Sequence, residues 1–309
     1  MICFARVALC LPLVCLLVCS PSTFAQKKGR QSLSVEKKTE TEKEPVKAPA
    51  AIDLSSLFPY RPIGSWVDKK FIFLPGPKAS EGSQYEDFTS KLIRKNFQGK
   101  IIKVISVSEF GGRTHLEFEV EETGERHRAR TLPNKETIKG LGLVEDLENA
   151  RREWGGKTLW CRQIMLATYD EANDLAGNIQ IKRYDAVKVI DVQPGWDEEK
   201  PVRFLLETTD GKHGFLDINL SGTNVFNEVR HLHRFENSFF IEDPKKLYKW
   251  SSETWRMIET GRILAGMTME QVKMSWGEPE KITRTETAEN WIYQTGTLIF
   301  KKGVLVANK

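Results

Sequence analysis

The sequence predicts a mainly β protein in which two tandem small β-barrel modules are followed by a C-terminal α+β domain. The first observation is a set of short runs in which apolar and polar residues alternate, as in half-buried antiparallel strands, at 100–108, 114–120, 186–192 and 202–208. The second is an internal repeat, because 103–127 and 188–214 share one order of strands and glycine turns. The third is a capped helix within 266–279, followed by further strand-like segments.

Residues 1–25 have the layout of a secretory signal peptide. Arg6 precedes an apolar run from Val7 to Val18, and small residues follow as far as Ala25. The run contains Pro12 and is too short to cross a hydrocarbon core of ~30 Å comfortably. We therefore expect export, to the periplasm or the outer membrane, without a transmembrane anchor.

Cysteine usage agrees with a processed, disulfide-free chain. Four of the five cysteines lie inside the expected signal peptide, so the mature chain would keep only Cys161 and could form no internal disulfide. Cys19 follows Val18, whereas a lipoprotein signal needs a small residue there, so lipid anchoring is disfavoured. Cys161 lies in a strand-like apolar context, and we expect an inert core thiol.

Residues 26–56 form a Lys/Glu-rich segment that we interpret as a disordered tether. Its stretch 26–51 lacks aromatic residues and holds seven Lys or Arg against four Glu. Together with Arg6, it accounts for the formal net charge of +4, which leaves the rest of the chain about neutral. A nucleic-acid partner is therefore not expected, although peripheral contact of the tether with a membrane is compatible with the sequence.

The two predicted β modules span 57–150 and 151–240. Similar openings precede the two repeats, at Trp66 and Gly155, and the spacing of ~85 to 90 residues suits a unit that closes its own core. Glycine turns at 122–125 and 209–212 indicate hairpins. The strand pattern resembles tandem SH3-like barrels. Between the modules, 134–154 is typical of one helix or an irregular connector.

The C-terminal domain is expected at 244–309. Thr268 can cap a helix, Gln271 completes a capping box, and Gly277 followed by Pro279 supplies the stop. A preceding helix is expected within 251–265. Three strand candidates follow, at 281–287, 290–295 and 297–306, with a potential break at Gly303. Two helices over a three-stranded antiparallel sheet make a compact ααβββ unit.

This domain resembles the SmpA/OmlA domain of the BamE family of outer-membrane assembly lipoproteins, whose fold the β-lactamase inhibitor protein shares. The resemblance covers about sixty residues and implies the ααβββ fold. The matched residues serve as caps, turns and core in any member, so the resemblance carries no binding site. They are Ile263, Gly266, Met267, Thr268, Gln271, Val272, Gly277, Pro279, Trp291, Tyr293, Leu298, Phe300 and Gly303.

The sequence offers little that indicates catalysis. His231 and His233, expected on one side of a strand, could bind a metal together with His213, but no acidic or cysteine ligand is adjacent, and we predict no metal site and no cofactor. Nucleophile elbows, phosphate loops and H-E-x-x-H helices are absent from the sequence. Trp196, in an expected Pro-Gly loop beside acidic residues, is the best candidate for an exposed binding anchor.

These patterns favour an exported, non-catalytic binding or adaptor protein of the bacterial cell envelope. Its expected partner is an envelope protein or a cell-wall polymer, and its expected role is support of outer-membrane assembly or integrity. The alternative is a secreted or periplasmic inhibitor of an enzyme, as the other branch of the resembled fold implies. A third, less favoured hypothesis is a metal-dependent hydrolase that uses the histidines.

Overall fold

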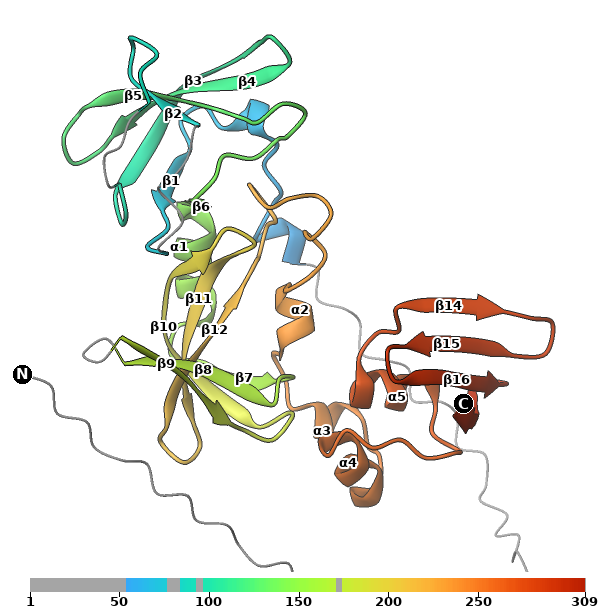
Figure 1. The fold of residues 1–309 in the computed structure, drawn as a ribbon. Coiled ribbons are helices and arrows are strands. Elements are labelled where there is room, and N and C mark those ends of the chain that lie inside the picture. The colour runs from blue at the N-terminus through green and yellow to red at the C-terminus, as the bar shows by residue number, and fades with distance from the viewer. Residues whose placement is uncertain (1–53, 77–83, 93–96, 171–173, 309) are drawn as a thin grey trace, which may run out of the picture. The chain divides into compact units, whose positions relative to one another are not determined.

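The computed structural model describes residues 54–76, 84–92, 97–170 and 174–308 (Figure 1). The expected signal peptide, its four cysteines and all of the tether before Leu54 lie outside the described residues. The described part of the chain is mainly β, as the sequence predicts, with three curled sheets that include a half-barrel. None of the described helices is long and apolar enough to span a bilayer.

The first sheet has six strands in the order β2-β5-β4-β3-β1-β6. Two single-turn 3₁₀ helices precede it, at Leu54–Ser56 and Ile63–Ser65. The strands are β1 (Lys70–Phe73), β2 (Tyr85–Glu86), β3 (Ile101–Phe110), β4 (Arg113–Val120), β5 (Arg126–Arg130) and β6 (Leu141–Leu143). Strict alternation of burial along β4 places Leu116 and Phe118 in an aromatic-rich core.

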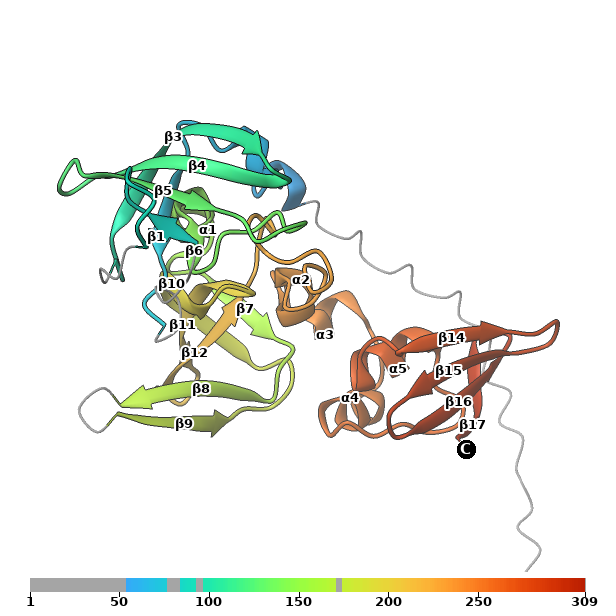
Figure 2. The same ribbon diagram turned by 45° about the horizontal axis from the view of Figure 1, so that its top comes forward.

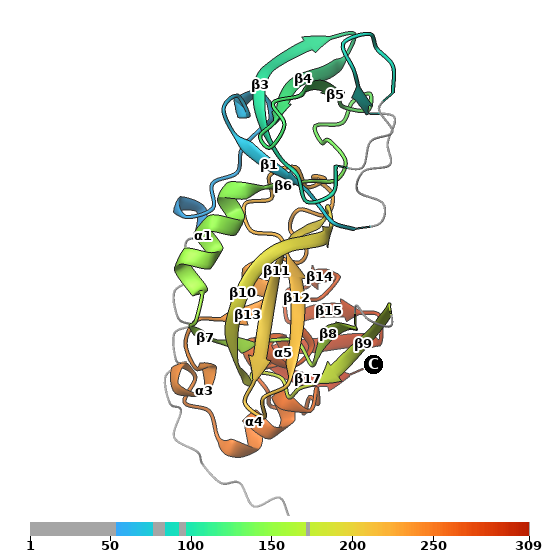
Figure 3. The ribbon, with the colours of Figure 1, turned by 90° about the vertical axis from the view of Figure 1, so that its left-hand side faces the viewer.

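The second sheet has seven strands in the order β13-β7-β10-β11-β12-β8-β9. Figure 3 shows the long strands β10, β11 and β12 side by side. The strands are β7 (Thr158–Cys161), β8 (Met165–Asp170), β9 (Leu175–Gln180), β10 (Ala186–Asp197), β11 (Lys200–Thr208), β12 (His213–Ile218) and β13 (Phe239–Phe240). The segment 134–154, for which the sequence left two alternatives, contains β6 and then α1 (Val144–Trp154).

The internal repeat appears as matching geometry in the two sheets. β3, β4 and β5 form an antiparallel meander, and so do β10, β11 and β12. The register shifts at the same repeat position, between Val104 and Ser106 in one sheet and between Val189 and Asp191 in the other. A bulge strengthens local twist, which explains why both meanders curl.

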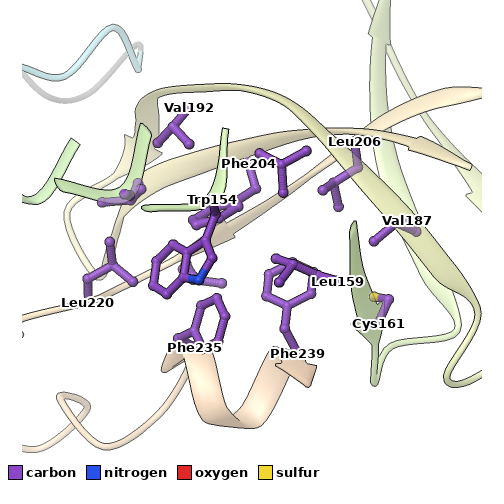
Figure 4. Close-up of a cluster of buried hydrophobic side chains, with 14 of the residues drawn as sticks. Trp154, Leu159, Cys161, Val187, Val192, Phe204, Leu206, Leu220, Phe235 and Phe239 are labelled. Carbon is purple, nitrogen blue, oxygen red and sulfur yellow. The ribbon is translucent and has the colours of Figure 1, made fainter. Parts of the chain in front are cut away.

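An aromatic stack forms the centre of the second core. The Trp154 ring, at the end of α1, stacks on Phe235 with centroids 4.1 Å apart and on Phe58 at 5.2 Å. Phe204 and Phe239 complete the cluster (Figure 4). Phe235 begins the short helix α2 (Phe235–Ser238). Residues from before the first sheet and from α1 therefore belong to the core of the second sheet.

The tip of the β10–β11 hairpin contacts the first module. The Gly140 amide donates to Glu198 Oε2 at 3.0 Å. A Cβ on Gly76 would lie 2.0 Å from the backbone oxygen of Trp196, so this approach requires glycine. Asn224 donates to the carbonyl oxygens of Ile138 and Leu141, both at 2.7 Å. The contacts of Gly140 and Gly76 fix the strand end that carries Trp196.

The C-terminal domain contains the two expected helices. They are α4 (Ser252–Glu259) and α5 (Met269–Trp276), preceded by the single-turn α3 (Pro244–Leu247). Ser251 caps α4 through its hydroxyl. The predicted capping box of α5 is present, because Thr268 accepts from the Gln271 amide at 3.2 Å and the Gln271 side chain accepts from the Thr268 amide at 2.9 Å. Gly277 ends the helix with φ 85°.

The sheet of this domain has four strands rather than the three predicted. The strands are β14 (Lys281–Arg284), β15 (Glu289–Tyr293), β16 (Gly296–Lys301) and β17 (Val304–Asn308), paired in sequence order (Figure 2). The candidate at 297–306 divides because Lys302 and Gly303 adopt positive φ and reverse the chain. The domain therefore has one strand more than the ααβββ arrangement that the resemblance implied.

Loss of the capping box should destabilise α5 measurably. The amides of the first helical turn have no backbone acceptor, and Thr268→Ala removes the hydroxyl that accepts from the Gln271 amide. We therefore expect a loss of about 1 kcal/mol in the free energy of unfolding. Denaturant unfolding of the full chain, with hydrogen exchange of the α5 amides, measures it. Thr268→Ser is the matched control and should keep wild-type stability, whereas equal losses in both variants would contradict the capping role.

Candidate functional site

One face of the second sheet carries a cluster of aromatic and charged side chains, which we call the Trp196 platform. Inward-facing residues of β11, such as Val202 and Phe204, enter the core, so the alternate residue Arg203 lies on the opposite face. The register places Asp217 of β12 directly opposite Arg203. The platform consists of Tyr169, Trp196, Arg203, Phe215 and Asp217.

Arg203 is the centre of the platform. Its Nε and one terminal nitrogen donate to the two carboxylate oxygens of Asp217, both at 2.7 Å. Its guanidinium carbon lies 3.6 Å from the centroid of the Phe215 ring and 4.3 Å from that of Trp196. The Arg203 side chain is only 7% exposed, so the ion pair is largely desolvated. The bidentate geometry compensates the charge, and both rings lie within cation–π distance of the guanidinium.

Trp196 is fixed in place and still exposed. Tyr169 meets its ring edge-on, with centroids 4.6 Å apart, and Phe215 lies at 6.2 Å. The hydroxyl of Tyr169 in turn donates to Asp174. Trp196 nevertheless keeps 36% of its surface exposed. A large aromatic ring held in one orientation loses little side-chain entropy on binding, as interface anchors require.

The structure places Trp196 in a strand and corrects the expectation of a Pro-Gly loop. Strand β10 continues to Asp197, which pairs with Lys200. Pro194 pairs with Val202 immediately before a register shift. The strand tolerates a proline and a glycine here because hydrogen bonding between the strands is interrupted at the register shift, so not every backbone amide has to donate.

The residues of the family motif lie in caps, turns and core. Trp291 is 2% exposed and packs on Phe300 with ring centroids 4.5 Å apart, and the hydroxyl of Tyr293 donates to the Gly277 carbonyl at 2.9 Å. The others are structural in the same sense: Ile263, Met267, Val272 and Leu298 pack in the core, and Gly266 and Gly303 have positive φ. This domain therefore supplies no cluster of functional side chains comparable to the platform.

The three candidate metal-binding histidines do not form a site. His231 and His233 lie in an irregular segment rather than the predicted strand, and His233 adopts φ 52°. Burial, with the nearby charge of Lys200, lowers the pKa of His233. His213 is exposed at the start of β12, with a carboxylate oxygen of Glu207 at 3.9 Å. Across the described ranges, no three His, Cys, Asp or Glu side chains group as metal ligands would.

Cys161 is fully buried in the second core, as expected. Burial raises the pKa of its thiol to about 12, so the thiolate is not accessible at neutral pH. Glu198, within the acidic run of the hairpin tip, accepts from the Gly140 amide, and burial raises its pKa. Neither group is paired with a partner suited to nucleophilic or acid–base catalysis.

A buried polar cluster surrounds Asp146 of α1. Its carboxylate accepts from the Ser221 hydroxyl at 2.7 Å and from the Ser221 amide at 3.3 Å, and the hydroxyl oxygens of Ser221 and Thr223 lie 2.8 Å apart. Asp146 is 2% exposed, and burial raises its pKa to about 7. The charge of Glu145 also raises the pKa and that of Arg61 lowers it, and these two residues form an ion pair with each other. The cluster joins α1 to the segment after β12 and is closed to substrate.

Comparisons with protein-family models, with curated proteins and with solved structures find no match for this chain. The site is therefore argued from its geometry alone. Sequence reasoning identified Trp196 but missed Tyr169, Arg203, Phe215 and Asp217. A signal was present, because Arg203 and Asp217 are charged residues at alternate positions of apolar strands. Pairing them required the register, which a sequence does not show.

The buried carboxylate predicts a stability that falls as the pH rises. Well below pH 4, Asp146 is neutral in both the folded and the unfolded chain. Between pH 4 and 7 the unfolded chain releases the proton more readily than the folded chain, so the free energy of unfolding declines, on the order of 4 kcal/mol in total. Above pH 7 the contribution is constant.

Asp146→Asn should remove this decline, because an amide does not titrate. Denaturant unfolding of both proteins between pH 4 and 8 measures the difference in slope. Asp191→Asn, which changes a partly exposed carboxylate beside Arg151, is the control and should retain the decline. Identical pH profiles for wild type and Asp146→Asn would show that Asp146 is not the responsible group.

Proposed function

We propose that the chain is an exported, non-catalytic adaptor of the bacterial cell envelope that binds another protein through the Trp196 platform. The observation that carries the proposal is an exposed tryptophan held between Tyr169 and the buried Arg203–Asp217 pair. Aromatic residues and arginine dominate the energetics of protein interfaces when they are ordered before binding. The expected signal peptide and tether support a location in the periplasm or at the outer membrane.

The charge pattern of the first module supports a protein partner rather than a nucleic acid. The basic side chains of β5 are paired with acidic neighbours: Arg126 with Glu119, Arg128 with Glu117, and Arg130 with Glu86. A nucleic-acid surface needs basic groups that are free to bind phosphates. Here the opposite charges alternate across adjacent strands, which stabilises the sheet instead.

The module architecture supports the adaptor role. We infer that the two repeats are SH3-like barrels and that the C-terminal domain is a BamE-like unit extended by one strand. The shared bulge position and shared meander support the first inference, and the capping box with the Trp291 core supports the second. In this proposal the modules provide binding surfaces and catalyse no reaction, and the partner class is an envelope protein.

The proposal predicts a cross-linked partner that depends on Trp196. A photo-reactive amino acid at Gln193, an exposed neighbour of Arg203 on β10, should capture one envelope protein in cells that produce the chain. Trp196→Ala should reduce the yield at least about tenfold, because it removes the anchor. Mass spectrometry of the cross-linked band identifies the partner.

Phe110→Ala is the matched control, since Phe110 is a surface aromatic that is 80% exposed next to the β3–β4 turn. It should leave the cross-link unchanged. Capture of a soluble enzyme would favour the inhibitor function instead. Trp196-dependent retention on purified cell-wall polymer, with no protein captured, would favour the polymer. A cross-link that survives Trp196→Ala would contradict the platform as the binding site.

A further inference from the structure

Strand β9 is an open sheet edge that lacks the usual protection. It is the last strand of the second sheet, and no described strand pairs with its outer side (Figure 2). Its six residues, Leu175–Gln180, include no charge and no proline. Natural proteins normally block such an edge with lysine, proline, a bulge or a covering segment.

Edges of the C-terminal sheet are protected in these ways. β14 carries Lys281 and Arg284. The outer side of β17 is covered by the segment before α5, because the Gly266 amide donates to Leu305, the Leu305 amide donates to Met267, and the Met269 amide donates to Gly303. By contrast, β9 is longer than the other edge strands, and in the described part of the chain no strand pairs with its outer side.

The register shows which backbone groups are available. The Ile181 amide donates to the Ile164 carbonyl, so hydrogen-bonded pairs with β8 recur at every second residue: Ile179, Gly177 and Leu175. The amides and carbonyls of the intervening residues, Ala176, Asn178 and Gln180, therefore point away from the sheet. Each of these three residues thus presents one amide and one carbonyl group outward. An added antiparallel strand requires such groups at every second residue.

The sequence around β9 is complementary to itself. In an antiparallel pairing of two copies centred on Asn178, Ala176 lies opposite the partner's Gln180. In the same register, Leu175, which is 65% exposed, lies opposite the partner's Ile181. An apolar pair thus meets at each end of the pairing.

We propose that two copies of this chain associate through β9, in antiparallel register about Asn178, to form one continuous sheet. About six backbone hydrogen bonds would join the strands, two for each outward pair. The two-fold axis of an antiparallel pair is perpendicular to the sheet, so both copies present the same face to the same side. The two Trp196 platforms then face one partner surface together, which raises avidity.

Analytical ultracentrifugation of the mature chain, across concentrations from about 1 to 100 μM, tests the association. The expected result is a monomer–dimer equilibrium. Asn178→Lys places like charges across the two-fold axis and should weaken dimerisation at least about tenfold. Its side chain is exposed, and circular dichroism confirms that the variant is folded. Thr283→Lys, on the outermost strand β14 of the C-terminal sheet, is the matched control and should dimerise normally.

Paired charges at Ala176 and Gln180, which are exposed and lie opposite each other in the proposed register, test that register. Ala176→Lys with Gln180→Lys brings like charges together and should weaken the dimer, whereas Ala176→Lys with Gln180→Glu brings opposite charges together and should restore it. A strictly monomeric wild-type protein at 100 μM would overturn the proposal. So would a dimer that is insensitive to Asn178→Lys, or an oppositely charged pair that weakens the dimer as much as the like-charged pair does.

The dimer proposal does not depend on the proposed function. Trp196→Ala should leave the monomer–dimer equilibrium unchanged, because Trp196 lies on β10 and not on the edge. Conversely, Asn178→Lys should weaken partner capture in the cross-linking experiment without abolishing it. A monomeric wild-type protein that still shows Trp196-dependent capture would overturn only the dimer proposal, whereas a β9 dimer without Trp196-dependent capture would overturn only the proposed function.

Discussion

The desolvated pair of Arg203 and Asp217 is the interaction on which the candidate site depends. A guanidinium this deeply buried is stable only when its charge is compensated, and both of its bonds to the carboxylate are 2.7 Å long. Its guanidinium lies within cation–π distance of the rings of both Phe215 and Trp196. The ion pair therefore fixes the guanidinium that contacts Trp196, and Trp196 is the platform residue that the sequence identified as a binding anchor.

The rest of the second module holds that pair in position. The bulge shared by both repeats curls the β10–β11 hairpin, and the hairpin tip contacts the first module through Gly76 and Gly140. On the core side, Trp154 and Phe235 hold the sheet against α1. The platform is therefore built on paired strands rather than on a loop, which keeps its geometry more rigid than loop residues would.

Local features were predictable from the sequence, and long-range pairing was not. The mainly β fold, the repeat and the helix caps follow from alternation, glycine turns and the Thr268–Gln271 box, all of which act within a few residues. The fourth C-terminal strand was missed because a turn at Lys302 and Gly303 divides one apolar run. Arg203 and Asp217 are fourteen positions apart, and only the register between β11 and β12 brings them together.

A double-mutant cycle between Trp196 and Arg203 tests most directly whether the buried arginine holds the exposed ring. Trp196→Ala, Arg203→Lys and the double variant would be compared by denaturant unfolding, with lysine chosen because it keeps the charge but loses the flat guanidinium. The predicted coupling free energy is about 0.5 to 1.5 kcal/mol, as expected for a partly desolvated cation–π contact. Strictly additive effects would contradict the account, since the ring would then be held without Arg203.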